Sequence, residues 1–216
     1  MFLGHLGTGF GAKAAAPKTS LGTLLLAAEL ADLLWPTLIL LGVELVEIRP
    51  GATRVMPLDF VHYPISHSLA ATLLWAGLFS LIYFLARSYR RGAIVVGLLV
   101  LGHWLLDAVV HRPDLPLLPG SDIRAGLGLW NSPWGAALVE LGIFAVGVWI
   151  YMRSTRALDR IGVLGLWGLV ALLLLIYGGN VFGGPPPSVG AVAWVGQAHW
   201  LLILWGYWVD RHRQPA

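Results

Sequence analysis

Three metal-binding side chains recur at four-residue intervals in one apolar segment: His103, Asp107 and His111. On a helix, each step of four residues advances by only about 40°, so the three side chains would share one face. Ionisable groups are costly inside an apolar segment, and there they are functional candidates by default. Neutral imidazoles and carboxylates together bind Zn²⁺, Mn²⁺ or Fe²⁺. The spacing therefore predicts a metal site on this helix.

Further ligand types lie around the first two apolar segments. His62 and His67 precede the second segment in the run His-Tyr-Pro-Ile-Ser-His-Ser. Asp32 lies inside the first segment, with Glu29 on the same helical face. His5 lies in a glycine-rich amino-terminal segment that could fold over the same cavity. The expected metal ligands are His5, Asp32, His62, His67, His103, Asp107 and His111.

The composition indicates a membrane protein. Hydrophobic residues make up 57% of the 216 residues and charged residues 12%, with a mean hydropathy of +0.76. A soluble domain of this length cannot bury so much apolar surface. We therefore expect residues 1–216 to form a single integral membrane domain. The absence of cysteine excludes disulfides and thiolate ligands, and the net charge of +3 is too scattered to favour nucleic acid as a partner.

Six apolar stretches are long enough to cross about 30 Å of hydrocarbon. They are Leu21–Val43, Ser68–Ala86, Gly92–Val110, Trp134–Tyr151, Ile161–Tyr177 and Val189–Val209. The expected fold is an all-α polytopic membrane helix bundle of about six transmembrane helices, preceded by a glycine-rich segment too short to span. Ser20 and Ser66 are the expected N-caps, and Pro36 is expected to kink the first span.

Lysine and arginine residues predict the orientation. The predicted spans divide these residues into two sets, one on each side of the membrane. The smaller set is Arg49, Arg54, Arg112 and Arg124. The larger set is Lys13, Lys18, Arg87, Arg90, Arg91, Arg153, Arg156, Arg160, Arg211 and Arg213. This asymmetry predicts a multi-pass protein of a bacterial-type inner (plasma) membrane with both termini in the cytoplasm. The candidate ligands would then converge near the outer ends of the second and third spans.

Two other polar features have less specific interpretations. The segment Gly7-Thr-Gly-Phe-Gly-Ala-Lys13 lacks the Gly-Lys-Ser/Thr ending of a phosphate-binding loop, so we expect a small-residue packing face. Glu140, inside the fourth span, is compatible with three roles: a partner of a metal ligand, a proton carrier or a contact between helices.

Two motifs resemble a known family. The first is His62-Tyr-Pro-Ile-Ser-His67-Ser68, which resembles the His-Arg-x-x-Thr-His-Ser signature of the YdjM-type inner-membrane proteins. These proteins are predicted metal-dependent hydrolases. The second is Gly102-His103-Trp-Leu-Leu-Asp107, which resembles the second signature of that family, His-x-x-x-Asp. The resemblance covers roughly the first 120 residues and implies ligand roles for His5 and Asp32. Tyr63 replaces the arginine of the signature, only Asp32 remains of the usual Asp-x-Asp pair, and His111 lies outside the motif.

These observations predict a membrane-embedded hydrolase that uses a metal-activated water on a lipid or lipid-linked (phospho)ester. Zinc is the expected metal, as one or two ions, with Mn and Fe as alternatives. Seven groups exceed the four-coordinate shell of zinc, so we expect either two ions or one ion with three or four direct ligands. His111 and Asp32 are expected to lie farthest from the ion. Asp107 and His111 are the candidate catalytic residues.

Three alternatives remain open at the level of sequence. The first is a divalent metal or proton transporter with Asp32, Asp107 and Glu140 as relay groups. The second is a di-iron membrane oxygenase or desaturase, although such enzymes array more histidines than this chain offers. The third is a haem protein with His103 and His199 as axial ligands. The sequence gives no oligomeric state.

Overall fold

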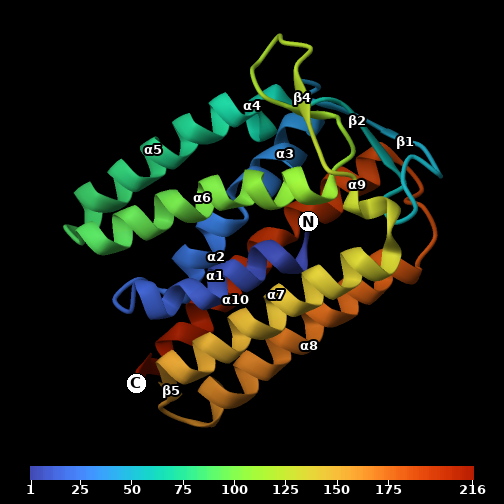
Figure 1. The fold of residues 1–216 in the computed structure, drawn as a ribbon. Helices are drawn as coiled ribbons and strands as arrows, with labels where there is room; N and C mark the ends of the chain where they lie inside the picture. The colour runs from blue at the N-terminus through green and yellow to red at the C-terminus, as the bar shows by residue number, and fades with distance from the viewer.

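The computed structural model describes residues 1–216 as a bundle of helices (Figure 1). The helices are α1 (Leu3–Ala15), α2 (Leu21–Ala28), α3 (Leu30–Leu40), α4 (Pro64–His67), α5 (Leu69–Arg87), α6 (Arg90–Val110), the 3₁₀ turn η1 (Leu129–Asn131), α7 (Pro133–Ser154), α8 (Arg160–Phe182), α9 (Val189–Gln197) and α10 (His199–Arg211). The strands are β1 (Leu45–Ile48), β2 (Leu58–His62), β3 (Leu115–Pro116), β4 (Arg124–Ala125), β5 (Thr155–Ala157) and β6 (Arg213–Pro215). Each strand pairs with one other strand only, as β1–β2, β3–β4 and β5–β6.

Five helices are long and apolar enough to cross a membrane: α5, α6, α7, α8 and the α9–α10 pair. A sixth span is formed if α2 and α3, which are bent by 59° relative to each other, count as one. The expected all-α membrane bundle is confirmed, and the chain has the features of a multi-pass membrane protein. The agreement follows from length and composition, because about 20 apolar residues must form a helix to satisfy their backbone groups in lipid.

The bend in the first span lies at Glu29, whereas a kink or the end of the regular helix was expected at Pro36. Glu29 has φ −105° and ψ 9°, which ends α2 and begins α3. Pro36 lies inside α3, where the helix continues past it. The carbonyl of Ala28, just before the bend, accepts a hydrogen bond from Nδ1 of His103 at 2.7 Å. This side chain satisfies a carbonyl at the helix end that has no partner within α2.

Serine hydroxyls cap the helices that begin the first and second spans. Ser20 caps α2 as expected, because its hydroxyl accepts from the amide of Thr23. The cap of α5 is Ser68, whose hydroxyl accepts from the amide of Ala71. The expectation that Ser66 is a cap was wrong, since this residue lies within the short helix α4.

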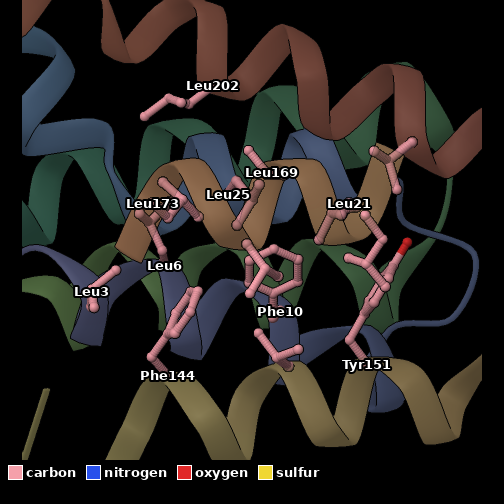
Figure 2. Close-up of a cluster of buried hydrophobic side chains, with 14 of the residues drawn as sticks. Leu3, Leu6, Phe10, Leu21, Leu25, Phe144, Tyr151, Leu169, Leu173 and Leu202 are labelled. Atoms are coloured by element: carbon pink, nitrogen blue, oxygen red, sulfur yellow. The ribbon is translucent and has the colours of Figure 1, made fainter. Parts of the chain in front are cut away.

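Helix α1 lies in the middle of the bundle in Figure 1, and its amino-terminal residues Met1 and Leu3 are buried. It packs closely along α7 because its glycines allow the two backbones to approach: a Cβ at Gly7 would lie 2.7 Å from Cα of Phe144. Figure 2 shows Leu6 and Phe10 of α1 packed among Phe144 of α7 and leucines of α2 and α8. The glycine-rich segment is therefore a helix-packing face, as expected.

The bundle has two chemically different ends. The α1–α2 turn, the α5–α6 turn, β5 and the carboxyl terminus lie along the left side of Figure 1. The larger set of lysines and arginines lies in or beside these turns. The β1–β2 hairpin, α4 and the β3–β4 connection lie at the opposite end (Figure 1). The candidate ligands lie toward this second end.

Candidate metal centre

Five of the seven expected ligands come together in the structure. They form two overlapping groups whose ligand atoms lie within 4.8 Å of one another. The first group is His5, His103 and Asp107; the second is Asp32, His67 and His103. Four separate elements contribute: α1, α3, α4 and α6. These groups could hold a metal ion.

Four of these side chains alternate between imidazole and carboxylate around a small ring. Oδ1 of Asp32 lies 3.3 Å from Nε2 of His67 and 3.9 Å from Nε2 of His103. Oδ2 of Asp107 lies 3.7 Å from Nε2 of His67 and 3.2 Å from Nε2 of His103. In a tetrahedral zinc site with bonds of about 2.0–2.1 Å, neighbouring ligand atoms lie about 3.3 Å apart. These four distances of 3.2–3.9 Å are near that value, so the four side chains are candidate ligands of a divalent ion.

The hydrogen bond that His103 makes on Nδ1 prepares Nε2 for a metal. Nδ1 donates its proton to the carbonyl of Ala28, because a carbonyl can only accept. In the neutral imidazole, Nε2 is then the nitrogen with the free lone pair. This Nε2 is buried and makes no well-aligned hydrogen bond, although Oδ2 of Asp107 lies 3.2 Å away. A buried polar atom without a partner is rare, and a metal ion would satisfy it.

A second chain of hydrogen bonds orients His67. The carboxylate of Glu44 accepts from the amides of Ile65 and Ser66, each at 2.8 Å. It also accepts from the hydroxyl of Ser66 at 2.6 Å. Since that hydroxyl donates to Glu44, its oxygen accepts from Nδ1 of His67, which lies 2.6 Å away. Nε2 of His67 is again left with its lone pair facing the ring of ligands.

Glu44 was not among the residues selected from the sequence. It is fully buried, yet it lies in the loop after α3, where a carboxylate is ordinarily exposed. Its partners, Ile65 and Ser66, are more than 20 residues away. No spacing rule connects these positions, so only the folded chain identifies the contact.

His5 lies behind the ring of four ligands. Its ring stacks on that of His103, with centroids 3.7 Å apart, and its Nε2 lies 3.0 Å from Oδ1 of Asp107. The amino group of Met1 lies 2.6 Å from the same oxygen. The two oxygens of Asp107 therefore face different partners: Oδ2 faces His67 and His103, whereas Oδ1 faces α1.

Glu140 holds the amino terminus of α1 next to this site. One carboxylate oxygen of Glu140 accepts from the amides of Phe2 and Leu3 at 2.9 and 3.0 Å. The first amides of a helix lack partners within the helix, and a carboxylate there is also favoured by the helix dipole. Of the three roles open for Glu140, these contacts support the one between helices.

His62 and His111 lie outside both groups. His62 is exposed at the end of β2. The helical spacing that includes His111 fails because α6 ends at Val110, and His111 has an extended backbone with ψ 145°. Its Nδ1 lies 3.0 Å from Oδ1 of Asp114, and its ring packs against Trp130.

A cavity of about 350 Å³ adjoins the metal centre. Asp32, His67, Asp107 and His111 line it, whereas His5 and His103 do not. Much of the remaining wall is apolar or aromatic and comes from α3, the β1–β2 hairpin, η1 and the α8–α9 connection. The candidate ligands therefore form a polar part of the cavity wall, and much of the rest of the wall is apolar.

Another buried acid–imidazole contact lies at two helix breaks. Glu29, at the break between α2 and α3, has no hydrogen-bond partner on either carboxylate oxygen. Nδ1 of His199, at the break between α9 and α10, lies 3.8 Å from Oε2 of Glu29. The sequence placed Glu29 on the face of Asp32 and His199 in mid-helix. The two breaks instead bring Glu29 and His199 toward each other.

Comparison with protein-family models, curated proteins and solved structures finds no match to this chain.

Proposed function

We propose that this protein is a membrane-embedded metal-dependent hydrolase whose ion is bound by Asp32, His67, His103 and Asp107. The observation that carries the proposal is the ring of four ligand atoms, together with the buried Nε2 of His103, which has no other partner. Two carboxylates also balance the charge of a divalent cation. His5 contacts the outer oxygen of Asp107, and we assign it a positioning role.

Zinc is the metal that we propose, with Mn²⁺ and Fe²⁺ as the alternatives that the same donors accept. A bound divalent ion would lower the pKa of water and polarise a phosphoryl or acyl oxygen. We propose one ion, because Nδ1 of His103 is committed to Ala28 and leaves a single nitrogen for coordination. A second ion would need His5 and Oδ1 of Asp107.

Asp32 marks the side from which a substrate would approach. Its side chain is 24% exposed, whereas those of His103 and Asp107 are 2% exposed. Asp32 also lines the cavity, so a bound molecule would reach the ion beside it. Zinc can expand to five ligands and Mn²⁺ accepts six, which leaves a coordination position open on that side.

The substrate that we propose is an amphiphile, such as a lipid or a lipid-linked (phospho)ester. Trp35, Phe60 and Trp130 line the cavity beside the metal centre, and such aromatic walls bind the apolar body of a ligand. His111 lines the same cavity and contacts Asp114. A histidine oriented by a carboxylate is a common proton-transfer group, and we assign that role to His111.

The Lys/Arg asymmetry supports a further part of the proposal, the location. With both termini in the cytoplasm, the metal centre would lie toward the outer leaflet of a bacterial-type inner membrane. The motifs around His62, His67, His103 and Asp107 support membership of the YdjM-type proteins, for which a metal-dependent hydrolase activity is predicted.

Metal-dependent lipid hydrolysis tests this function. Purified protein would be stripped with chelator, reloaded with Zn²⁺ or Mn²⁺ and incubated with phosphoester lipids and acyl-ester lipids, with products identified by mass spectrometry. We expect hydrolysis only in the reloaded protein and its loss in Asp107→Ala. Metal-loaded protein that cleaves neither lipid class contradicts the proposal.

Transport of a divalent metal or protons is the second candidate function, and a separate observation favours it. The first span is broken at Glu29, as in transporters with discontinuous helices, and His199, at the boundary between α9 and α10, lies beside this break. Glu29 then replaces Glu140 in the expected relay, because Glu140 is bound to backbone amides. Uptake of Zn²⁺ or protons into proteoliposomes, without lipid hydrolysis, would favour this reading.

A further inference from the structure

A second cavity, of about 450 Å³, lies at the Lys/Arg-rich end of the molecule. Its walls come from α2, α5 and α10. None of its lining residues also lines the cavity at the metal centre. The two cavities are therefore separate sites, and the chemistry of the second can be examined by itself.

The charges around this second cavity favour an anion. Arg87, the last residue of α5, and Arg211, the last residue of α10, both line it and are exposed. Neither arginine takes part in an ion pair. Asp210 also lines the cavity, but its carboxylate binds Nζ of Lys13 at 2.8 and 3.1 Å. With that acid neutralised, two free guanidinium groups remain.

Hydroxyl groups on the wall add a hydrogen-bond donor. Oγ1 of Thr23 lies 2.9 Å from the hydroxyl of Tyr207 and 2.8 Å from Oγ of Ser20. Three hydroxyls share these two hydrogen bonds, and each hydroxyl has one proton to donate. One of the three hydroxyls therefore keeps a proton for another acceptor. A phosphate oxygen is such an acceptor.

The rest of the cavity wall is apolar. Leu26, Phe79 and Ile82 line it, and each lies one to two helical turns from the arginines or hydroxyls on its own helix. Ile82 is 52% exposed on the outer surface of α5. The cavity therefore has a positively charged part at the ends of the spans and an apolar part farther along the spans, toward the membrane interior.

We infer that this cavity binds an anionic phospholipid, with the headgroup phosphate between Arg87 and Arg211 and an acyl chain along Phe79 and Ile82. Charge complementarity selects the anion, and the apolar wall selects a ligand with a hydrocarbon chain. Arginine suits this position because its planar guanidinium can donate two parallel hydrogen bonds to a phosphate. Basic residues at the membrane surface strengthen binding to anionic lipid by about fivefold each.

Lipid titration of the purified full-length protein tests this site. Phosphatidylglycerol is added to detergent-solubilised protein, with phosphatidylcholine as the comparison lipid, and binding is followed by native mass spectrometry. We expect preferential binding of phosphatidylglycerol, weakened roughly 25-fold in the double variant Arg87→Gln/Arg211→Gln. Ala86→Phe, which fills the cavity without changing charge, should also weaken binding.

The matched control is Arg160→Gln, since Arg160 is exposed at the same end of the molecule but lies outside the cavity. It should bind phosphatidylglycerol like the parent protein. Unchanged binding in the double variant, or equal weakening by Arg160→Gln, overturns the inference. The proposed metal centre lies at the other end of the molecule and is tested by metal content. The lipid-binding result is therefore independent of the proposed hydrolase function.

Discussion

At His67 and His103, the proton on one ring nitrogen decides whether the other nitrogen can bind a metal. In both residues Nδ1 is committed: in His103 to the carbonyl of Ala28 and in His67 to the hydroxyl of Ser66. Partners of this kind commonly fix the tautomer of metal-binding histidines. The sequence predicted the two imidazoles, but these partners come from segments that only the fold brings close.

Removing the charge of Glu44 should weaken the metal site through His67. In Glu44→Gln, the amide can donate to Ser66, so the hydroxyl no longer needs to accept from Nδ1 of His67. We expect metal affinity to fall about 10- to 100-fold, measured by competition with a chromogenic chelator. Glu47→Gln is the control, because the side chain of Glu47 is 60% exposed and forms its ion pair with Arg49, away from the site. Equal affinities in Glu44→Gln and the parent protein would argue against this role.

His111 should affect the reaction without affecting metal binding. It lines the cavity but lies outside both groups of ligands. For a proton-transfer group we expect His111→Gln to lower the hydrolysis rate by about 10²- to 10⁴-fold, with metal content unchanged. Loss of metal in this variant would instead make His111 a ligand.

At the scale of elements, the positions of the helix ends determine which predictions from the sequence agree with the structure. The spans could be predicted because a long apolar run has only one way to satisfy its backbone in lipid. His103 and Asp107 share a face because α6 continues through both. The third step, to His111, fails because the helix ends one residue earlier. The break at Glu29 lies beside a hydrogen bond from a distant helix to Ala28, and no glycine or proline there predicts it.

The packing of α1 on α7 should control the position of His5. A Cβ at Gly7 would lie 2.7 Å from Cα of Phe144, whereas a Cβ at Gly11 would lie 3.5 Å from Cα of Gly147. The first contact must displace a helix, and the second is an ordinary van der Waals contact. We expect Gly7→Ala to destabilise the protein by about 1–3 kcal/mol and Gly11→Ala to be tolerated, as measured by thermal unfolding in detergent. Equal melting temperatures for the two variants would contradict this packing argument.

At the scale of the whole molecule, the two ends have different chemistry. The metal centre and its cavity lie toward one end, and the larger set of lysines and arginines lies at the other. This polarity follows from the sequence, because the positive charges select the side on which each loop remains. The convergence of α1, α3, α4 and α6 on one site is a property of the fold, since the connecting segments do not specify which spans become neighbours.

Single cysteines test the orientation, and the chain offers a clean background because it has no cysteine. Ser88 lies in the α5–α6 turn and Ser121 in the β3–β4 connection. We expect Ser88→Cys to react with a membrane-impermeant maleimide only from the cytoplasmic side and Ser121→Cys only from the outside. Labelling of both from the same side would contradict the proposed topology.

The central claim is that one divalent ion is bound by Asp32, His67, His103 and Asp107, and metal content measures it most directly. The measurement is elemental analysis of purified, zinc-reloaded protein, with monodispersity checked by gel filtration. We expect about one ion per chain in the parent protein and in His62→Ala, since His62 is exposed and outside the site, and loss of metal in His103→Ala and Asp107→Ala. Full retention of metal by both of these variants, or its absence from the reloaded parent protein, would contradict the claim.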